Sequence, residues 1–373
     1  MAADTHRGWD LYVRDRLADT LEIITVAVDG EAAGGGALGM AISDNGRYVA
    51  FSSRAGNIVR GDENRTTDVF VRDRWRDSTQ RVSVASGGRE ANGPSFNPSL
   101  FADGRRVSFT SNATNLAHGD TNGEVDVFVH DRLSRVTTLA SVSSSGQPGN
   151  SYSGTAELSP NGSHVAFVSN ATNLSRSDTN DVRDVFVRNL STQETRRLSI
   201  GNSEQQANDY SDDPSLSANG RFVVFQSGAD NLVPRDESPF TDVFVRDRAA
   251  HTTRLVSVDS RGRQDFSLST SPSISASGRF IAFDSSAQLV PSPPTVFQDV
   301  YVRDLLAGTT QLVTVPTMGE FTECCSGEPE ISADGHHVVF YSSSRKIVTG
   351  ESDSVERDVF VRDQREDARW LVP

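Results

Sequence analysis

One short hydrophobic pattern recurs along the chain at a nearly fixed distance. Valine and aromatic side chains lie between a leading aspartate and a closing pair that is usually Arg-Asp. The copies are at 10–15 (DLYVRD), 68–73 (DVFVRD), 126–131 (DVFVHD), 184–189 (DVFVRN), 242–247 (DVFVRD), 299–304 (DVYVRD) and 358–363 (DVFVRD). Their spacings are 58, 58, 58, 58, 57 and 59 residues. A period of this length is typical of a chain built from repeated supersecondary units.

Three further segments separate successive copies of the hexapeptide. One ends in an Asn-Gly, Asp-Gly or Ser-Gly turn, a strand such as 221–226 follows that turn, and a strand such as 254–258 follows the hexapeptide. Glycine supplies the positive φ that a tight hairpin needs. Each unit is therefore predicted to form four strands, which we call a, b, c and d, with the hexapeptide as strand c.

Strand b carries a phenylalanine at one register in every unit, namely Phe51, Phe109, Phe167, Phe225, Phe283 and Phe340. Alternate strand residues share a face, so these rings are expected to lie between neighbouring sheets. Because a single four-stranded sheet cannot bury both faces, closing such sheets around an axis is favoured. The sequence predicts an all-β fold, a six-bladed β-propeller of four-stranded antiparallel blades, with 1–373 as one domain. An open β-solenoid is less consistent, because its repeats are usually much shorter.

The two ends of the chain do not complete this count. There are seven c strands but six a and six b strands, and the last d strand, at 369–372, stops early. We expect the N-terminal strands within 1–28 to close the ring, with 21–26 completing the outer edge of the final blade. A seventh, partial blade that includes 11–13 is the alternative.

The combined motif resembles that of a known bacterial family. Where Ser-x-Asp/Asn-Gly-Arg-x-Val-x-Phe meets Asp-Val-Phe-Val-Arg-Asp, the chain is similar to the TolB-like family of WD-like propeller repeats, over nearly its whole length. The resemblance implies the propeller fold. Members that look like this serve as protein-binding modules, as extracellular scaffolds or as gating domains beside a hydrolase, and some propellers hold an active site in the central channel. Fold alone does not choose among these functions.

Charge and composition exclude several classes of function. The formal net charge of −14 disfavours binding to a nucleic acid backbone. No apolar run approaches the roughly 18 residues that a membrane-spanning helix needs, and the first 30 residues lack the pattern of a secretory signal. We expect a soluble protein, secreted or periplasmic if a signal peptide has been removed and cytoplasmic otherwise. The two cysteines are adjacent, at 324 and 325, so no disulfide framework is expected.

The loop before strand c repeats oxygen-bearing side chains at its first, third and seventh positions. The three best copies are Asp62, Asn64 and Asp68; Asp120, Asn122 and Asp126; and Asp178, Asn180 and Asp184. Such oxygens can converge on a hard cation, which makes calcium the candidate cofactor, whereas no organic cofactor is expected. The alternative is that these residues form Asx turns and fix strand c. Prolines replace the acids in the fifth loop, and this loss favours a mainly structural role.

Comparison of the copies separates constant positions from variable ones. One strand-a register reads Ala37, Ser95, Ser153, Ser211, Ser269 and Ser326, whereas two residues later it reads Gly39, Asn97, Thr155, Asp213, Ser271 and Glu328. Because innermost strands line the channel, we expect the variable register to face the axis, beside aromatic and acidic residues of the preceding loops. The candidate ligand-binding residues are Asn97, Tyr152, Asp209, Tyr210, Asp212, Asp213, Phe266, Phe321, Glu323 and Glu328. The alternative is a solvated rim around a water-filled channel.

Signatures of catalysis are missing from the sequence. The histidines show no zinc-type spacing, and neither a Gly-x-Ser-x-Gly elbow nor a glycine-rich phosphate loop occurs. The first hypothesis is a non-catalytic binding or scaffold propeller for a protein, carbohydrate or small-molecule ligand. The second is an enzyme of the lyase, hydrolase or cyclase type that uses carboxylates such as Asp213 and Glu328 as acid and base. Loss of both carboxylates would weaken the affinity of a binder but would stop turnover by an enzyme.

Overall fold

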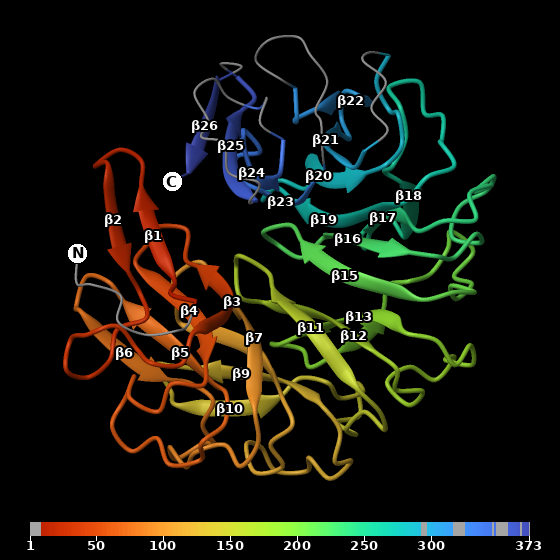
Figure 1. Ribbon diagram of the computed structural model, residues 1–373. Helices are drawn as coiled ribbons and strands as arrows, with labels where there is room; N and C mark the ends of the chain where they lie inside the picture. Colours follow the sequence, from red (N-terminus) through yellow and green to blue (C-terminus); the bar gives the residue numbers. More distant parts are fainter. Residues whose placement is uncertain are drawn as a thin grey trace. The chain divides into compact units, whose positions relative to one another are not determined.

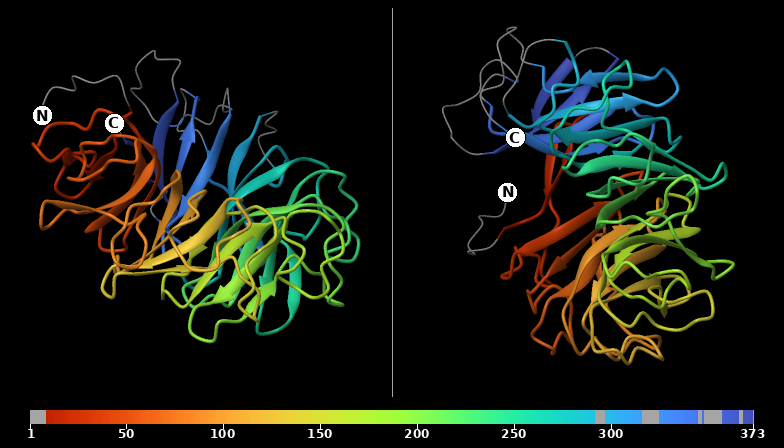
Figure 2. Two further views of the ribbon diagram at one scale, coloured as in Figure 1. Left: turned by 90° about the horizontal axis from the view of Figure 1, so that it is seen from below. Right: turned by 90° about the vertical axis from the view of Figure 1, so that its right-hand side faces the viewer.

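The fold consists of strands and loops. The computed structural model describes residues 9–291, 297–315, 325–344, 347, 357–365 and 368–372. Within these residues there is no helix, and hence no helix that could cross a membrane. The described residues form 26 strands, which make up six four-stranded sheets and one two-stranded sheet. Figures 1 and 2 show their arrangement along the chain.

The six four-stranded sheets follow one another along the chain, and each runs from strand a to strand d without a crossover. We call them blades 1 to 6. Blade 1 contains β3 (Ala37–Ile42), β4 (Tyr48–Ser53), β5 (Asp68–Asp73) and β6 (Ser78–Arg81). Blade 2 contains β7 (Ser95–Leu100), β8 (Arg106–Ser111), β9 (Asp126–Asp131) and β10 (Val136–Leu139). Blade 3 contains β11 (Ser153–Leu158), β12 (His164–Ser169), β13 (Asp184–Asn189) and β14 (Thr195–Arg197).

The second half of the chain repeats this arrangement. Blade 4 contains β15 (Ser211–Leu216), β16 (Phe222–Ser227), β17 (Asp242–Asp247) and β18 (Thr252–Leu255). Blade 5 contains β19 (Ser269–Ile274), β20 (Phe280–Ser285), β21 (Asp299–Asp304) and β22 (Thr309–Leu312). Blade 6 contains β23 (Ser326–Ile331), β24 (His337–Ser342), β25 (Asp358–Asp363) and β26 (Ala368–Val372). The six antiparallel blades confirm the predicted fold class, an all-β propeller.

The chain divides into two compact units. Unit 1 comprises Met1–Asp178 with Val187–Arg196, and unit 2 comprises Thr179–Phe186 with Arg197–Pro373. Blades 1 and 2 therefore belong to unit 1, whereas blades 4, 5 and 6 belong to unit 2. The chain changes unit within blade 3. The expectation of one domain over 1–373 stays a prediction.

The N-terminal strands form a hairpin of their own. β1 (Tyr12–Asp15) pairs with β2 (Thr20–Ile23) in the two-stranded sheet. Leu11 and Ile24 pack into a core shared with blade 1, so the hairpin has the place of strands c and d of an incomplete repeat. The outer strand of blade 6 is β26 and not the segment 21–26, because Thr20–Ile23 is already paired with β1. Closure of the ring by residues 1–28 stays a prediction.

Aromatic pairs hold strands b and c together. Phe51 lies opposite Phe70, and their ring centroids are 5.6 Å apart. The same stack occurs at Phe109–Phe128, Phe225–Phe244, Phe283–Tyr301 and Phe340–Phe360. Cross-strand aromatic pairs of this kind stabilise a sheet and present a continuous apolar face to the next layer.

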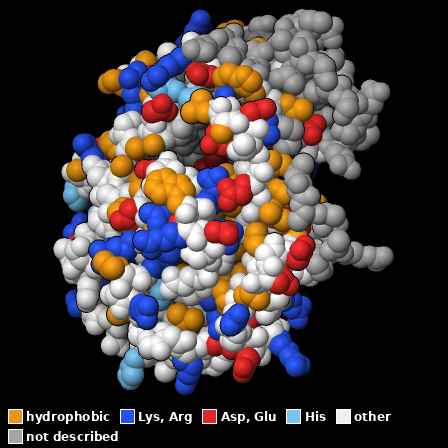
Figure 3. Space-filling view, turned by 90° about the vertical axis from the view of Figure 1, so that its left-hand side faces the viewer, with side chains coloured by type: hydrophobic (Ala, Val, Ile, Leu, Met, Phe, Trp, Pro, Cys, Tyr) orange, Lys and Arg blue, Asp and Glu red, His pale blue; other side chains and the backbone are white. Residues whose placement is uncertain are grey.

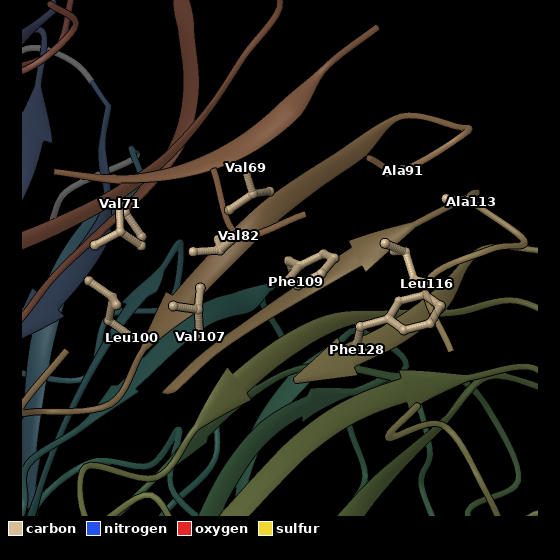
Figure 4. Close-up of a cluster of buried hydrophobic side chains, with 11 residues drawn as sticks. Val69, Val71, Val82, Ala91, Leu100, Val107, Phe109, Ala113, Leu116 and Phe128 are labelled. Atoms are coloured by element: carbon tan, nitrogen blue, oxygen red, sulfur yellow. The ribbon is translucent and has the colours of Figure 1, made fainter. Parts of the chain in front are cut away.

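Neighbouring blades within each unit bury these faces against one another. In Figure 4, Val69 and Val71 of blade 1 share a cluster with Val107, Phe109 and Phe128 of blade 2. Equivalent clusters join blades 4 and 5 and blades 5 and 6. The expectation that the strand-b phenylalanines lie between blades is confirmed for these pairs of blades.

The a-to-b turns also take part in the contacts between blades. Gly104 has a φ of +70°, and a Cβ at this position would lie 2.2 Å from the ring of Tyr48 in blade 1. Gly278 approaches the ring of Phe222 equally closely. Each of these glycines thus meets two requirements: it adopts the positive φ of the turn, and it leaves room for the aromatic ring that packs against it.

Candidate functional site

The first strand of every blade contains a β-bulge. Pairing between strands a and b shifts register at the same place in all six blades, between Leu38/Met40, Phe96/Ser99, Gly154/Glu157, Asp212/Ser215, Thr270/Ser273 and Gly327/Glu330. A bulge interrupts the ladder locally and redirects side chains, and bulges are common beside functional sites.

The variable strand-a register lies inside this bulge. Its members all have positive φ: Gly39 at 55°, Asn97 at 50°, Thr155 at 42°, Asp213 at 53°, Ser271 at 52° and Glu328 at 48°. Five of the six are not glycine, although a left-handed backbone favours glycine and costs other residues about 1 kcal/mol or more. The strict alternation assumed from the sequence therefore does not hold at this register.

In unit 2 the backbone amides of the bulge are bound by side chains. The amide of Asp213 donates to Asp212 Oδ1 (2.9 Å). The amide of Ser271 donates to Gln226 Oε1 in blade 4 (3.1 Å), and that of Glu328 donates to Asp284 Oδ2 in blade 5 (3.1 Å). Strand b of one blade thus holds the bulge of the next.

Five carboxylates gather around these bulges, and we call them the acidic cluster. Its members are Asp212, Asp213, Asp284, Glu328 and Glu330, from β15, β20 and β23 of unit 2. Asp284 Oδ1 accepts hydrogen bonds from Thr270 Oγ1 (2.5 Å) and Gln298 Nε2 (2.8 Å). Glu330 Oε2 accepts one from Ser273 Oγ (2.8 Å). Hydrogen bonds to neutral groups therefore hold Asp284 and Glu330 in place.

Gly327 allows the close approach of strands that forms the acidic cluster. A Cβ at this position would lie 3.0 Å from Asp284 Oδ2 and 3.1 Å from the hydroxyl of Tyr341. Contacts this short require a neighbouring atom to move. A glycine here therefore lets strand β23 lie against the carboxylate of Asp284.

Burial raises the pKa of two carboxyls in the acidic cluster, and repulsion between carboxylates adds to the effect at Asp213. Burial raises the pKa of Asp213 to about 6, and the negative charges of Asp212, Glu330, Asp284 and Glu328 act in the same direction. Part of Glu330 is exposed to solvent, but protein atoms surround most of the side chain. This burial raises the pKa of Glu330, whereas the hydrogen bond from Ser273 lowers it, and the effect of burial is the larger. Two carboxyls of the cluster therefore bind protons more readily than ordinary acids.

Compensating positive charge is scarce around the acidic cluster. Arg183 Nη1 donates to Asp212. In the part of the chain that the structure describes, no lysine or arginine forms an ion pair with Asp213, Asp284, Glu328 or Glu330. Arg357 lies 4.5 Å from the centroid of the Tyr341 ring, whose pKa is raised by burial and also by the nearby carboxylates Glu328 and Asp284. The arrangement can bind a cation, or it can donate and accept protons near neutral pH.

The structure brings three of the predicted ligand-binding residues together, namely Asp212, Asp213 and Glu328. Asn97 occupies the equivalent bulge in blade 2, where its Oδ1 would lie 3.4 Å from a Cβ built on Gly39. Tyr152 folds over Gly154 in blade 3. The placement of this register at the axis of a ring stays a prediction.

The other predicted residues lie elsewhere in unit 2 or outside the described residues. Tyr210 is 39% exposed and shares a hydrogen bond with Thr241, while Asp209 Oδ1 accepts one from the amide of Tyr210. Phe266 lines a separate surface groove of about 630 Å³, together with Arg235 and Arg254. Phe321 and Glu323 fall in the part of the chain that is not described. A ligand-binding role for these residues stays a prediction.

Sequence reasoning missed Asp284 and Glu330. Asp284 lies at a strand-b register that reads Ser52, Thr110, Val168, Gln226, Asp284 and Tyr341. This register varies among the copies as much as the strand-a register does. The same comparison of copies, applied to strand b, would have identified Asp284 from the sequence.

In the first two loops proposed for calcium, the asparagines form Asx turns. Asn64 Oδ1 accepts a hydrogen bond from the amide of Thr66 (3.0 Å), and its Nδ2 donates to Asp68 Oδ2 (2.9 Å). Asn122 makes the same two bonds to the amide of Glu124 (2.9 Å) and to Asp126 (2.8 Å). In blade 3, Asn180 Nδ2 donates to Asp184 (3.3 Å). This geometry matches the structural alternative, and calcium binding stays a prediction.

Blade 1 also contains a cluster of carboxylates that is close enough to hold a metal. Oxygens of Asp62, Asp68 and Glu90 all lie within 4.8 Å of one another. However, Arg81 forms ion pairs with all three. The guanidinium therefore already supplies the positive charge, and a metal ion would have to displace it.

On the molecular surface, acidic side chains do not form one continuous patch on the face shown in Figure 3. Arginine side chains lie among aspartate and glutamate over this face. On this face negative and positive side chains are therefore interspersed, whereas the acidic cluster brings together five carboxylates from β15, β20 and β23.

The sequence matches no protein-family model and no curated protein. Solved structures do match. The chain aligns with a prolyl endopeptidase at 14% identity and a TM-score of 0.60, covering 97% of this chain and 46% of the other. It aligns with an oligogalacturonate lyase in complex with manganese at 10% identity and a TM-score of 0.55, covering 97% and 83%.

A third match is the β-propeller domain of the trilobed protease from Pyrococcus furiosus. Identity is 12%, the TM-score is 0.53, and the alignment covers 91% of this chain and 82% of the other. TolB from Agrobacterium tumefaciens also aligns, at 14% identity and a TM-score of 0.48, over 81% of this chain and 87% of the other. At these identities the matches show the fold alone, and the fold does not decide the function.

Proposed function

We propose that this chain is a binding propeller whose acidic cluster takes a positively charged segment of a partner protein. The observation that supports this proposal is the concentration of five carboxylates in unit 2, four of which have no ion pair among the described residues.

The chemistry of the acidic cluster favours a guanidinium or ammonium group as the ligand. A cation placed among these carboxylates would relieve the repulsion that, together with burial, raises the pKa of Asp213. Charge-assisted hydrogen bonds to carboxylates are stronger than neutral ones, and an arginine side chain can bridge two carboxylates at once. A neutral carbohydrate would gain hydrogen bonds here but would leave the repulsion in place.

The proposal is tested with an arginine-rich peptide as the probe and with binding measured by calorimetry. Replacing Asp213 by Asn together with Glu330 by Gln is expected to weaken binding by at least tenfold, about 1.4 kcal/mol. The matched control is Asp44→Asn with Glu31→Gln, which removes the same charge from exposed positions of unit 1. Equal weakening by both double variants would show attraction to the net charge alone and would contradict a site at the acidic cluster.

A second candidate function is catalysis in the same cluster. An acid with a pKa near 6, such as Asp213, can exchange protons near neutral pH, as a general acid or base must. The chain aligns with 83% of an oligogalacturonate lyase, and this likeness supports a test for lyase activity. An enzyme of the lyase, hydrolase or cyclase type would lose turnover in Asp213→Asn, whereas a binder would lose affinity alone.

A further inference from the structure

In blades 1, 2 and 4 a pair of buried or half-buried aspartates stands at the base of strand c. One member begins the loop before strand c, and the other begins strand c itself. The pairs are Asp62 and Asp68, Asp120 and Asp126, and Asp236 and Asp242. Two carboxylates held close together repel each other, so each blade needs a group between them.

Blade 1 places an arginine between its two carboxylates. Arg81 Nη1 lies 3.3 Å from Asp62 Oδ1 and 3.6 Å from Asp68 Oδ2, and it also pairs with Glu90. Arg81 is 58 residues before Leu139 and Glu90 is 58 residues before Pro148, so Leu139 and Pro148 are their counterparts in blade 2.

Blade 3 supplies an arginine to the aspartate that begins its strand c, and blade 4 supplies a glutamine to its aspartate pair. In blade 3, Arg197 Nη1 lies 3.3 Å from Asp184 Oδ2. In blade 4 a single atom bridges the pair, because Gln264 Nε2 donates to both Asp236 Oδ1 (2.7 Å) and Asp242 Oδ2 (2.8 Å). In blades 1 and 4, a nitrogen that can donate hydrogen bonds therefore lies between Oδ1 of the first aspartate and Oδ2 of the second.

Blade 2 has the same aspartate pair without such a donor. Leu139 and Pro148 cannot donate a hydrogen bond from their side chains. Asp120 is 7% exposed, and its Oδ1, the atom that is bound in blades 1 and 4, is buried without a hydrogen-bond partner. Asp126 is fully buried, and burial together with the charge of Asp120 raises its pKa to about 6.

We propose that blade 2 binds a hard divalent cation of the calcium class between Asp120 and Asp126. The ion would take the place that Arg81 Nη1 and Gln264 Nε2 have in their blades. Carboxylate oxygens are the ligands that such a cation prefers, and backbone carbonyls or water can complete its coordination. Asn122 is a positioning residue, because its Oδ1 accepts from the amide of Glu124 while its Nδ2 holds Asp126.

The test uses the full chain, stripped of metal with a chelator and then titrated with calcium chloride. Calorimetry is expected to give one site per chain, and a saturating ion is expected to raise the melting temperature by roughly 2–4 °C. Asp120→Asn is expected to abolish both effects. Asp62→Asn in blade 1 is the matched control and is expected to keep them.

Leu139→Arg provides a second, independent variant. It rebuilds the arrangement of blade 1, so the guanidinium is expected to replace the ion and to give a folded protein whose melting temperature no longer depends on calcium. The proposal is overturned if calcium, magnesium and manganese all fail to bind the metal-free chain. It is equally overturned if binding survives in Asp120→Asn, or if Asp62→Asn is the variant that loses it.

Discussion

Replacing Phe109 by alanine is expected to lower the free energy of unfolding by about 3 to 5 kcal/mol, the usual range for removing a fully buried aromatic ring. Phe109 is 0% exposed, it stacks on Phe128 with centroids 5.9 Å apart, and it packs against valines of blade 1 (Figure 4). Its removal thus weakens both the sheet of blade 2 and the layer between the two blades.

Urea unfolding followed by circular dichroism measures this loss. Phe266→Ala is the matched control, because Phe266 is 58% exposed and its removal leaves no buried cavity. We expect the control to change stability by less than about 1 kcal/mol. Equal effects of the two substitutions would mean that the layer between blades does not depend on the strand-b aromatics.

The repeat in the sequence was sufficient to predict the blades. Burial of both faces of a short sheet demands apolar residues at fixed registers, so the amino-acid sequence alone assigns Phe109, Phe283 and Phe340 to the layers between blades. The tight a-to-b turns were equally predictable, because glycine at positions such as Gly104 has no substitute. Both features arise from local rules that every copy of the repeat obeys.

The bulge in strand a was not predictable from the alternation of polar and apolar residues. Alternation assumes a regular strand, whereas Asp213 and Glu328 adopt positive φ between two stretches of paired backbone. The residue with positive φ is not a glycine in blades 2 to 6, so the sequence carries no direct signal for this conformation. The sequence shows the bulge only as a variable register, and its conformation is visible only in the folded chain.

The partners of the paired aspartates could not be assigned from the loop sequences alone. Arg81 and Gln264 lie on other segments, 13 to 28 residues after the aspartates that they contact. Leu139 has the position in blade 2 that Arg81 has in blade 1. Only the folded blades show what lies between the two aspartates, which is an arginine in blade 1, a glutamine in blade 4 and no hydrogen-bond donor in blade 2. A calcium-like spacing in the loop therefore predicted oxygen ligands without predicting the side chains that compete with the ion.

Replacing Asp213 by asparagine is expected to stabilise the protein at neutral pH. The pKa of Asp213 is raised to about 6, against 3.8 for the ordinary group, because burial and four neighbouring carboxylates disfavour its charged form. Each unit of pKa corresponds to about 1.4 kcal/mol, and partial exposure reduces the effect, so we expect a gain of about 1 to 2 kcal/mol at pH 7.5. A functional site often lowers stability in this way.

The dependence of this gain on pH follows from the direction of the shift. Below pH 4, Asp213 is protonated in the folded protein, so it is as neutral as asparagine and the two proteins are expected to be equally stable. Between pH 4 and 6 the unfolded chain has ionised this carboxyl while the folded wild type still holds its proton, so the stability of the wild type falls relative to that of Asp213→Asn. Above pH 6 the carboxyl is ionised in both states, and the difference stays constant. As the pH rises through 6, the folded Asp213 becomes charged, and the acidic cluster is expected to gain affinity for a cationic peptide.

Urea unfolding of both proteins at pH 4, 6 and 7.5 checks this dependence. Asp212→Asn serves as the control, because Asp212 lies next to Asp213 but forms an ion pair with Arg183. Losing that ion pair offsets the relief of repulsion, so we expect no gain from Asp212→Asn at any of the three pH values. If Asp213→Asn gives no gain at pH 7.5, or the same gain at pH 4, then Asp213 is not held among charged neighbours, and the acidic cluster loses its physical basis as a cation site.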